Sequence, residues 1–318
     1  MAISVSIAEI LLIGSVLAIG FESNERKFVV DKIHQVTRKL RKYMSIKSKI
    51  KHLVSFLLHG ETRPIYANIH YLEPNEQLKG RKIIITGGGR GLGKAMAKKF
   101  ISEGASVLIA GRNEETLKRS AAELKCKWLT LDVQDVDSFR QFIDNADGIL
   151  EGVNCLVNNA GISLHESGFL EVLPKQFDAQ FDTNLKGAFF LTQAFIEKTT
   201  KQDGMKNILF TSSETSMTVD ERPYGLSKAA LNSLIQGLAY RYVNDNYRIN
   251  AVAPGVTVSD MVGGDVDGDL SFDNITHRYY LPEEVAEVAC FLLSDASNCL
   301  NGQILVCNEG KTINARWK

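Results

Sequence analysis

A tyrosine and a lysine four residues apart, Tyr224 and Lys228, stand at the start of an apolar-periodic stretch that begins with Pro223. Residues four apart on a helix share one face. A free phenol titrates near pH ~10, but an ammonium close by lowers its pKa. The spacing therefore predicts a tyrosine that acts as general acid and base, with Lys228 lowering its pKa. A solvated helix face is the simpler interpretation of the same pair.

A glycine-rich stretch, TGGGRGLGKA, follows the apolar run KIIIT and opens another helix-like stretch. Gly87, Gly91 and Gly93 let the backbone turn sharply and approach a pyrophosphate closely. The first turn of the following helix offers unpaired N–H groups and the positive end of its dipole. Strand, turn and helix agree, so the sequence predicts a dinucleotide site here rather than only a tight connection.

The residues after the second apolar run bear on the choice of nicotinamide coenzyme. An acidic residue at this position binds the ribose 2′-hydroxyl of NAD, but the sequence here is Ala110–Arg112, with no acid. The Arg112 guanidinium offers a fork of donors to a 2′-phosphate, and Arg90 in the glycine turn adds a second cation. The sequence therefore predicts NADP(H) in preference to NAD(H), although both arginines could also be solvated surface residues.

The elements that must position these residues follow a regular pattern from Lys79 onward. Short apolar runs alternate with helix-like stretches, and the runs are KIIIT, SVLIAG, KWLTLDV, NCLVNNAG, NILFTSS, RINAVAPG and QILV. Helices are expected from about Gly91, from about Asn113, over Asp135–Leu150, over Phe177–Lys198, from Tyr224 and from Pro282. Strands alternating with helices predict an α/β fold, a Rossmann-like, doubly wound parallel sheet of seven strands.

The glycine spacing Gly87-x-x-x-Gly91-x-Gly93 resembles the TGxxxGxG motif of the classical short-chain dehydrogenase/reductase family, and the resemblance covers about residues 79–310. Further motifs follow in that family's order: NNAG at 158–161, Asn184 in DTNLKGAFF, Ser213 in FTSS, the Tyr224–Lys228 pair, and Pro254–Gly255. The resemblance implies one Rossmann-like domain and an NADP(H)-dependent oxidoreductase that interconverts a carbonyl and a secondary alcohol.

The resemblance also implies a role for each catalytic residue. Tyr224 would donate a proton to the carbonyl oxygen as hydride arrives from the nicotinamide, and Lys228 would hold the nicotinamide ribose. Ser213 would hydrogen-bond the substrate oxygen, and Asn184 would position a water for proton relay. A serine capping a turn and an asparagine satisfying backbone groups are the alternatives for these last two residues.

The coenzyme site implied by the glycine turn and the resemblance draws on six segments of the chain. Asp132 is expected to meet the adenine, and Asn159 is expected to lie along the coenzyme. The full set is Gly87, Arg90, Gly91, Leu92, Gly93, Arg112, Asp132, Val133, Asn159, Ala160, Gly161, Tyr224, Lys228, Pro254, Gly255 and Thr257.

The catalytic serine departs from the family's spacing. Most members place it thirteen residues before the tyrosine, whereas Ser213 is eleven and Ser212 twelve residues before Tyr224. Alignment on the end of the strand favours Ser213, with Ser212 and Ser216 as alternatives.

The first 78 residues read differently from the rest. Ala2–Phe21 is nearly all apolar except for Glu9, and ten Lys or Arg residues against one acid fall between Arg26 and Lys51. One interpretation is a membrane anchor with a cytoplasmic basic flank; the other is soluble helices that cover the main domain or a neighbouring subunit. The predicted division is a helical extension over 1–78, with an apolar segment 2–21 and a basic amphipathic segment 22–60, and a catalytic domain over 79–318.

Composition and residue spacing bear on the expected location of the protein, on metal binding and on its partners. Five cysteines without paired spacing favour a reducing compartment, so a cytoplasmic location is expected, with the catalytic domain facing the cytoplasm if residues 1–60 meet a membrane surface. No metal-ligand spacing is found, so no metal is predicted. Apolar periodicity in the basic segment favours a membrane or subunit partner over nucleic acid. The resemblance implies a small carbonyl or alcohol substrate and a homo-oligomer, dimer or tetramer.

The segment after Pro254–Gly255 is expected to form a polar lid over the substrate, since it carries Asp265, Asp267, Asp269 and Asp273 among glycines. A sugar or polyol derivative is the favoured substrate class, and a 3-oxoacyl thioester or a lipid ketone stays open. The alternative from another class is a non-catalytic NADP-binding sensor or scaffold that docks through its basic N-terminal arm.

Overall fold

The computed structural model describes residues 76–259, 270–272 and 275–313. The predicted apolar and basic N-terminal segments, and the aspartates of the predicted lid, lie outside these residues. Within the described ranges, no helix is both long and apolar enough to cross a membrane.

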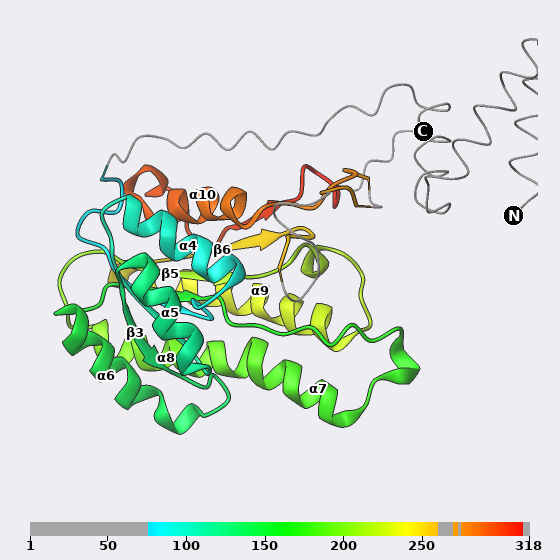
Figure 1. Cartoon of the computed structure of the whole chain (residues 1–318), viewed down its shortest axis with the longest axis horizontal. Helices are drawn as coiled ribbons and strands as arrows, with labels where there is room; N and C mark the ends of the chain where they lie inside the picture. Colours follow the sequence, from blue (N-terminus) through cyan, green and yellow to red (C-terminus); the bar gives the residue numbers. More distant parts are fainter. Residues whose placement is uncertain (1–75, 260–269, 273–274, 314–318) are drawn as a thin grey trace, which may run out of the picture. The chain divides into compact units, whose positions relative to one another are not determined.

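Seven parallel strands form one sheet in the order β3-β2-β1-β4-β5-β6-β7, which confirms the predicted fold class (Figure 1). The chain crosses over between β1 and β4, the neighbours at which the strand order reverses. The strands are β1 (Lys82–Thr86), β2 (Ser106–Gly111), β3 (Lys127–Thr130), β4 (Cys155–Asn158), β5 (Lys206–Thr211), β6 (Tyr247–Pro254) and β7 (Ile304–Cys307).

Helices cover both faces of the sheet. The α-helices are α4 (Gly91–Ser102), α5 (Glu114–Leu124), α6 (Phe139–Leu150), α7 (Pro174–Phe181), α8 (Ala188–Thr199), α9 (Pro223–Tyr242) and α10 (Pro282–Leu293). Short helical turns are η1 (Val136–Ser138), η2 (Phe169–Glu171), η3 (Asp182–Gly187), η4 (Glu214–Met217), η5 (Val243–Asp245) and η6 (Asp295–Ser297). Helices α4, α5 and α10 pack on one face, and α6, α8 and α9 pack on the other (Figure 1).

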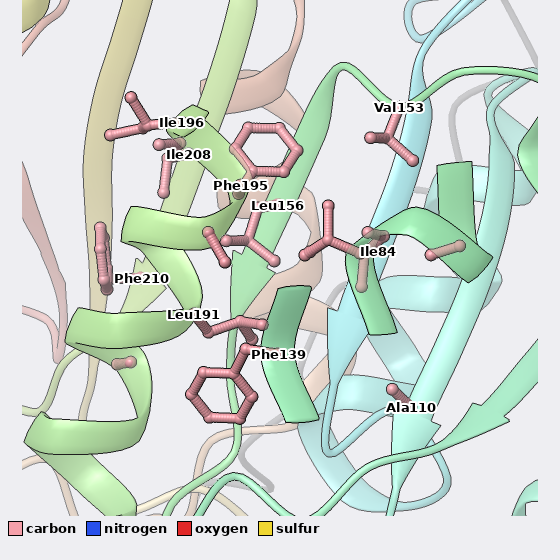
Figure 2. Packing of buried hydrophobic residues seen from close by; sticks show 14 of the residues in the cluster. Ile84, Ala110, Phe139, Val153, Leu156, Leu191, Phe195, Ile196, Ile208 and Phe210 are labelled. Carbon is pink, nitrogen blue, oxygen red and sulfur yellow. The ribbon is translucent and has the colours of Figure 1, made fainter. Parts of the chain in front are cut away.

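Successive side chains of each strand point to opposite faces of the sheet, and this alternation explains the two layers of helices. In β1, Ile83 and Ile85 point to the face of α4 and α10, whereas Ile84 points to the face of α6 and α8. Figure 2 shows Ile84 of β1 and Leu156 of β4 packed near Phe195 of α8. Because strands buried on both faces need apolar residues at every position, the continuous runs in the sequence mark the sheet directly.

The predicted helix over Phe177–Lys198 is present and contains a π-helical turn, η3 (Asp182–Gly187), between α7 and α8. Such wide turns inside helices are rare and are frequent at functional sites. The strand predicted from KWLTLDV also ends early, at Thr130, so that Asp132 and Val133 lie in the loop beyond β3.

Candidate active site

A groove of about 680 Å³ runs along the carboxyl ends of the strands, across the crossover between β1 and β4. This is where open parallel sheets bind ligands. All sixteen residues predicted to bind the coenzyme line the groove, as does Ser213. Asn184 does not line it. The fold therefore brings segments far apart in the sequence to one place.

The glycine turn makes a shape that side chains would fill. Gly87 has φ +65, a left-handed conformation that favours glycine. A Cβ on Gly93 would fall well inside contact distance of the Gly87 carbonyl oxygen. Within the described chain, no side chain caps the N-terminus of α4, and its first turn holds no acidic residue. These N–H groups and the dipole suit an outside anion, so the turn fits a pyrophosphate.

Asn159 holds this turn in place. Its Nδ2 donates to the carbonyl oxygens of Thr86 (3.0 Å) and Gly87 (3.3 Å). Its Oδ1 accepts a hydrogen bond from Thr211 Oγ1 at 3.2 Å, at the end of β5. Asn159 thus lines the groove, as expected, and also ties the ends of β1, β4 and β5 together.

At the far end of the groove, Arg112 follows β2 directly and is exposed, as is Arg90 in the glycine turn. Asn113 and Thr116 line the same end of the groove. Asp132 lines it as well, and its Oδ1 accepts a hydrogen bond from the Gln134 backbone N–H at 3.0 Å. The two guanidinium groups make this end suitable for a phosphate on the adenosine ribose.

Lys228 is buried at the other end, with 3% of its surface exposed. Its Nζ donates to the Thr211 carbonyl oxygen at 2.7 Å and lies 5.8 Å from the centroid of the Tyr224 ring. Burial lowers the pKa of the Lys228 ammonium to about 8. A Cβ on Gly161 would come within 3.4 Å of Nζ, so glycine leaves room beside the ammonium.

Lys228 is not among the protein's own groups that shift the pKa of Tyr224, so a lowering by Lys228 together with an oxidised nicotinamide stays a prediction. Burial raises the pKa of the phenol above 10, a hydrogen bond with Ser213 lowers it, and the charge of Glu214 raises it further. Burial is the main cause of the raised pKa, and the Lys228 ammonium donates to the Thr211 carbonyl oxygen.

The three candidate serines have different partners. The Ser213 hydroxyl reaches Tyr224 and accepts hydrogen bonds from the backbone and side chain of Thr215 (3.3 and 3.0 Å). Ser212 donates instead to Asn232 Oδ1 at 2.6 Å, and Asn232 Nδ2 donates to Ser216 Oγ at 2.8 Å. The geometry thus favours Ser213 as the serine that meets a substrate oxygen.

Asn184 sits in the π-helical turn, behind the wall of the groove. Its side chain accepts from the Ile162 backbone N–H at 2.8 Å and donates to the Ile162 carbonyl oxygen at 2.9 Å and to Ser227 Oγ at 3.1 Å. These bonds fix the segment after β4 to the helix that carries Tyr224. The water relay expected from Asn184 stays a prediction.

Sequence reasoning missed two residues at the site. Thr86, at the end of β1, accepts hydrogen bonds from the backbone N–H groups of Asn159 and Ala160, both at 3.0 Å. Glu214 follows Ser213 and is buried, and its charge acts on Tyr224. An acid directly after the strand-end serines was visible in the sequence, but its partners were not.

Comparisons with known proteins agree with this site. A family model described as enoyl-(acyl carrier protein) reductase matches residues 87–312. The chain is 35% identical over 240 residues, 72% of its length and 95% of the relative, to a 3α-hydroxysteroid dehydrogenase of Mediterraneibacter gnavus. It is 30% identical over 239 residues, 72% of its length and 93% of the relative, to an NAD-dependent glycerol dehydrogenase of Listeria innocua. A short-chain dehydrogenase of Burkholderia cenocepacia in complex with NADP is structurally similar, with a TM-score of 0.67 and 27% identity over 75% of this chain and 100% of that one.

Proposed function

The chain belongs to the short-chain dehydrogenase/reductase family, a family of oxidoreductases acting on CH–OH and carbonyl groups, and on that premise we propose that it interconverts a carbonyl and a secondary alcohol with NADP(H). The observation that carries the proposal is the meeting of Ser213, Tyr224 and Lys228 in the same groove as the glycine turn. A proton donor and a nucleotide site in one groove suit hydride transfer coupled to proton transfer.

In the proposed reduction, a nicotinamide held in the groove would supply the hydride for the carbonyl carbon. Ser213 donates a hydrogen bond to the carbonyl oxygen, and the Tyr224 hydroxyl donates its proton to that oxygen, which yields the alcohol. Lys228 holds the ribose and places its ammonium near the phenolate that remains. The burial of the Lys228 side chain keeps water from its ammonium and strengthens these electrostatic effects.

The preference for NADP(H) rests on the arginines at the adenosine end. Arg112 replaces the acid that NAD-binding sites carry after the second strand, and Arg90 adds a second positive charge. Similar proteins do not decide the matter, since one is named as NAD-dependent and another holds NADP. The charges of this chain itself therefore support the proposal.

The substrate class we propose is a sugar or polyol derivative, in line with the polar residues expected around the lid. The relative that oxidises glycerol supports this class. A 3-oxoacyl thioester is the second class, and a relative 30% identical over 245 residues, named a 3-oxoacyl-[acyl-carrier-protein] reductase of Aquifex aeolicus, supports it.

The test follows NADPH absorbance with the purified full chain and panels of sugars, polyol-derived ketones, 3-oxoacyl thioesters and steroid ketones. We expect turnover on one panel, and we expect Tyr224→Phe to lose at least about a thousandfold in kcat while NADPH still binds. NADPH binding without turnover on every panel would overturn the proposal in favour of a non-catalytic sensor.

A further inference from the structure

A carboxylate with distant partners directly follows Ser213, which hydrogen-bonds the proposed proton donor. Glu214, the first residue of η4, is 6% exposed. Its Oε1 contacts Lys311 Nζ at 2.6 Å, and its Oε2 accepts a hydrogen bond from Asn308 Nδ2 at 3.0 Å. These partners are 97 and 94 residues away in the sequence. A carboxylate buried to this extent needs such partners, because desolvation penalises its charge.

Both partners belong to one turn, residues 308–313, which directly follows β7. Asn308 is 2% exposed, and its side chain also bonds within the turn, to the Gly310 N–H (3.2 Å) and to Thr312 Oγ1 (3.2 Å). The Lys311 N–H donates to the Asn308 carbonyl oxygen at 3.1 Å. The turn that presents Lys311 is thus fixed by its own hydrogen bonds.

The same turn borders the coenzyme groove. A Cβ on Gly255 would lie 3.1 Å from Asn308 Cβ and closer still to the Tyr280 ring, and the Gly255 N–H donates to the Cys307 carbonyl oxygen at 2.9 Å. One short segment therefore joins the serine loop to the Pro254–Gly255 loop of the groove.

The other charges nearby belong to a separate network. Arg278 pairs with Glu284 at 2.8 Å and with Glu309 at 2.7 Å, and its guanidinium lies over the Tyr280 ring. The charges of Glu214 and Glu309 both raise the pKa of the Tyr280 phenol, to which burial contributes most. Among the described residues, Lys311 is the cation in direct contact with Glu214.

We propose that Glu214 is a positioning residue, which Lys311 and Asn308 hold so that its carboxylate fixes the Ser213 loop and sets the charge that Tyr224 faces. The proposal rests on the proposed role of Tyr224 as proton donor. It adds to burial and the Ser213 hydrogen bond a control of the phenol that is held by the turn at residues 308–313.

The charges and contacts of Glu214 and Lys311 predict the direction in which a substitution of either residue moves the pKa of Tyr224. The negative charge of Glu214 raises the pKa of Tyr224, in addition to burial. The Lys311 ammonium at 2.6 Å offsets part of that charge. Removing Glu214's charge must therefore favour the phenolate, whereas removing Lys311's charge must disfavour it.

The experiment titrates Tyr224 itself. The full chain is labelled with tyrosine carrying ¹³C at Cζ, and the Tyr224 resonance among the nine tyrosines is assigned with Tyr224→Phe. We expect Glu214→Gln to move the titration down by about one pH unit and Lys311→Met to move it up by about half a unit. Lys311→Arg is expected to keep the wild-type value.

A matched control is the exposed pair Arg140 and Glu197, which is remote from the groove. Glu197→Gln and Arg140→Met should leave the Tyr224 titration unchanged. The proposal would be overturned if Tyr224 titrated with the same midpoint in wild type, Glu214→Gln and Lys311→Met. Shifts in the same direction for both variants would also overturn it. The NMR titration needs no substrate, so its failure is distinct from a failure of the proposed oxidoreductase reaction. Where a substrate is turned over, the alkaline limb of kcat/KM for reduction should follow the same shifts.

Discussion

The two ends of the groove are built by different means. At the coenzyme end, the backbone makes the site: glycines at 87 and 93 leave space, and Asn159 ties three strand ends together. At the catalytic end, buried side chains make it, with Lys228 bonded to Thr211 and Glu214 bonded to Lys311. The first end thus depends on the absence of side chains, whereas the second depends on charged side chains and the partners that hold them.

The sharpest test at the catalytic end compares two adjacent serines. Ser213→Ala removes the hydroxyl beside Tyr224, and we expect kcat to fall about 10²- to 10³-fold, because a donor to the developing oxyanion is lost. Ser212→Ala breaks the 2.6 Å bond to Asn232 and should change kcat by only a few fold while lowering stability. Steady-state kinetics and urea unfolding of both variants measure this difference; the reverse order would assign catalysis to Ser212.

At the coenzyme end, Gly93→Ala places a methyl group against the Gly87 carbonyl oxygen. The turn must then shift, and we expect the Kd for NADPH to rise about 100-fold, about 2.7 kcal/mol. Gly148→Ala in α6 is the control, because nothing lies within 4 Å of its added Cβ. Titration calorimetry measures both variants. NADPH binding by Gly93→Ala at wild-type affinity would show that the close approach is not needed.

The titration of Lys228, at the catalytic end, should also make the stability of the protein depend on pH. The pKa of Lys228 is about 8 in the fold against 10.5 unfolded, so between these values the unfolded chain binds the extra proton. Stability should therefore rise with pH, and relative to Lys228→Met the free energy of unfolding should increase by about 2.5 kcal/mol from pH 7 to pH 10. Urea unfolding at the two pH values measures it. Parallel pH profiles for wild type and variant would mean that the ammonium is not desolvated.

The smallest expected effect is that of Arg112→Ala, at the coenzyme end, on coenzyme affinity. We expect about a tenfold loss of NADPH affinity, about 1.4 kcal/mol, with the affinity for NADH unchanged, because only the 2′-phosphate loses its partner. Lys118→Ala, an exposed residue of α5 paired with Glu114, is the control. Fluorescence titration with both coenzymes measures the ratio, and equal losses for NADPH and NADH would contradict the arginine interpretation.

The difference between the coenzyme end and the catalytic end also explains which parts of the site could be predicted from the sequence. The coenzyme end was accessible from sequence because glycine spacing and apolar runs are local signals, and every residue predicted there lines the groove. The catalytic end was only partly accessible. Its residue types were identified, but the direction of the Lys228 ammonium depends on the Thr211 carbonyl, and the pKa of Tyr224 depends on burial, Ser213 and Glu214. The π-helical turn at Asn184 was missed because it interrupts a helix whose apolar periodicity continues through it.

The amino-acid sequence by itself determined the alternation of strands and helices, the glycine turn and the four-residue spacing of Tyr224 and Lys228, because each is a pattern of neighbouring residues. Only the tertiary structure decided which serine faces the phenol and that Glu214 meets Lys311. The physical reason is that burial and charge act through space. A pKa or an ion pair is set by whichever groups the fold brings within a few ångströms, and spacing along the chain does not reveal them.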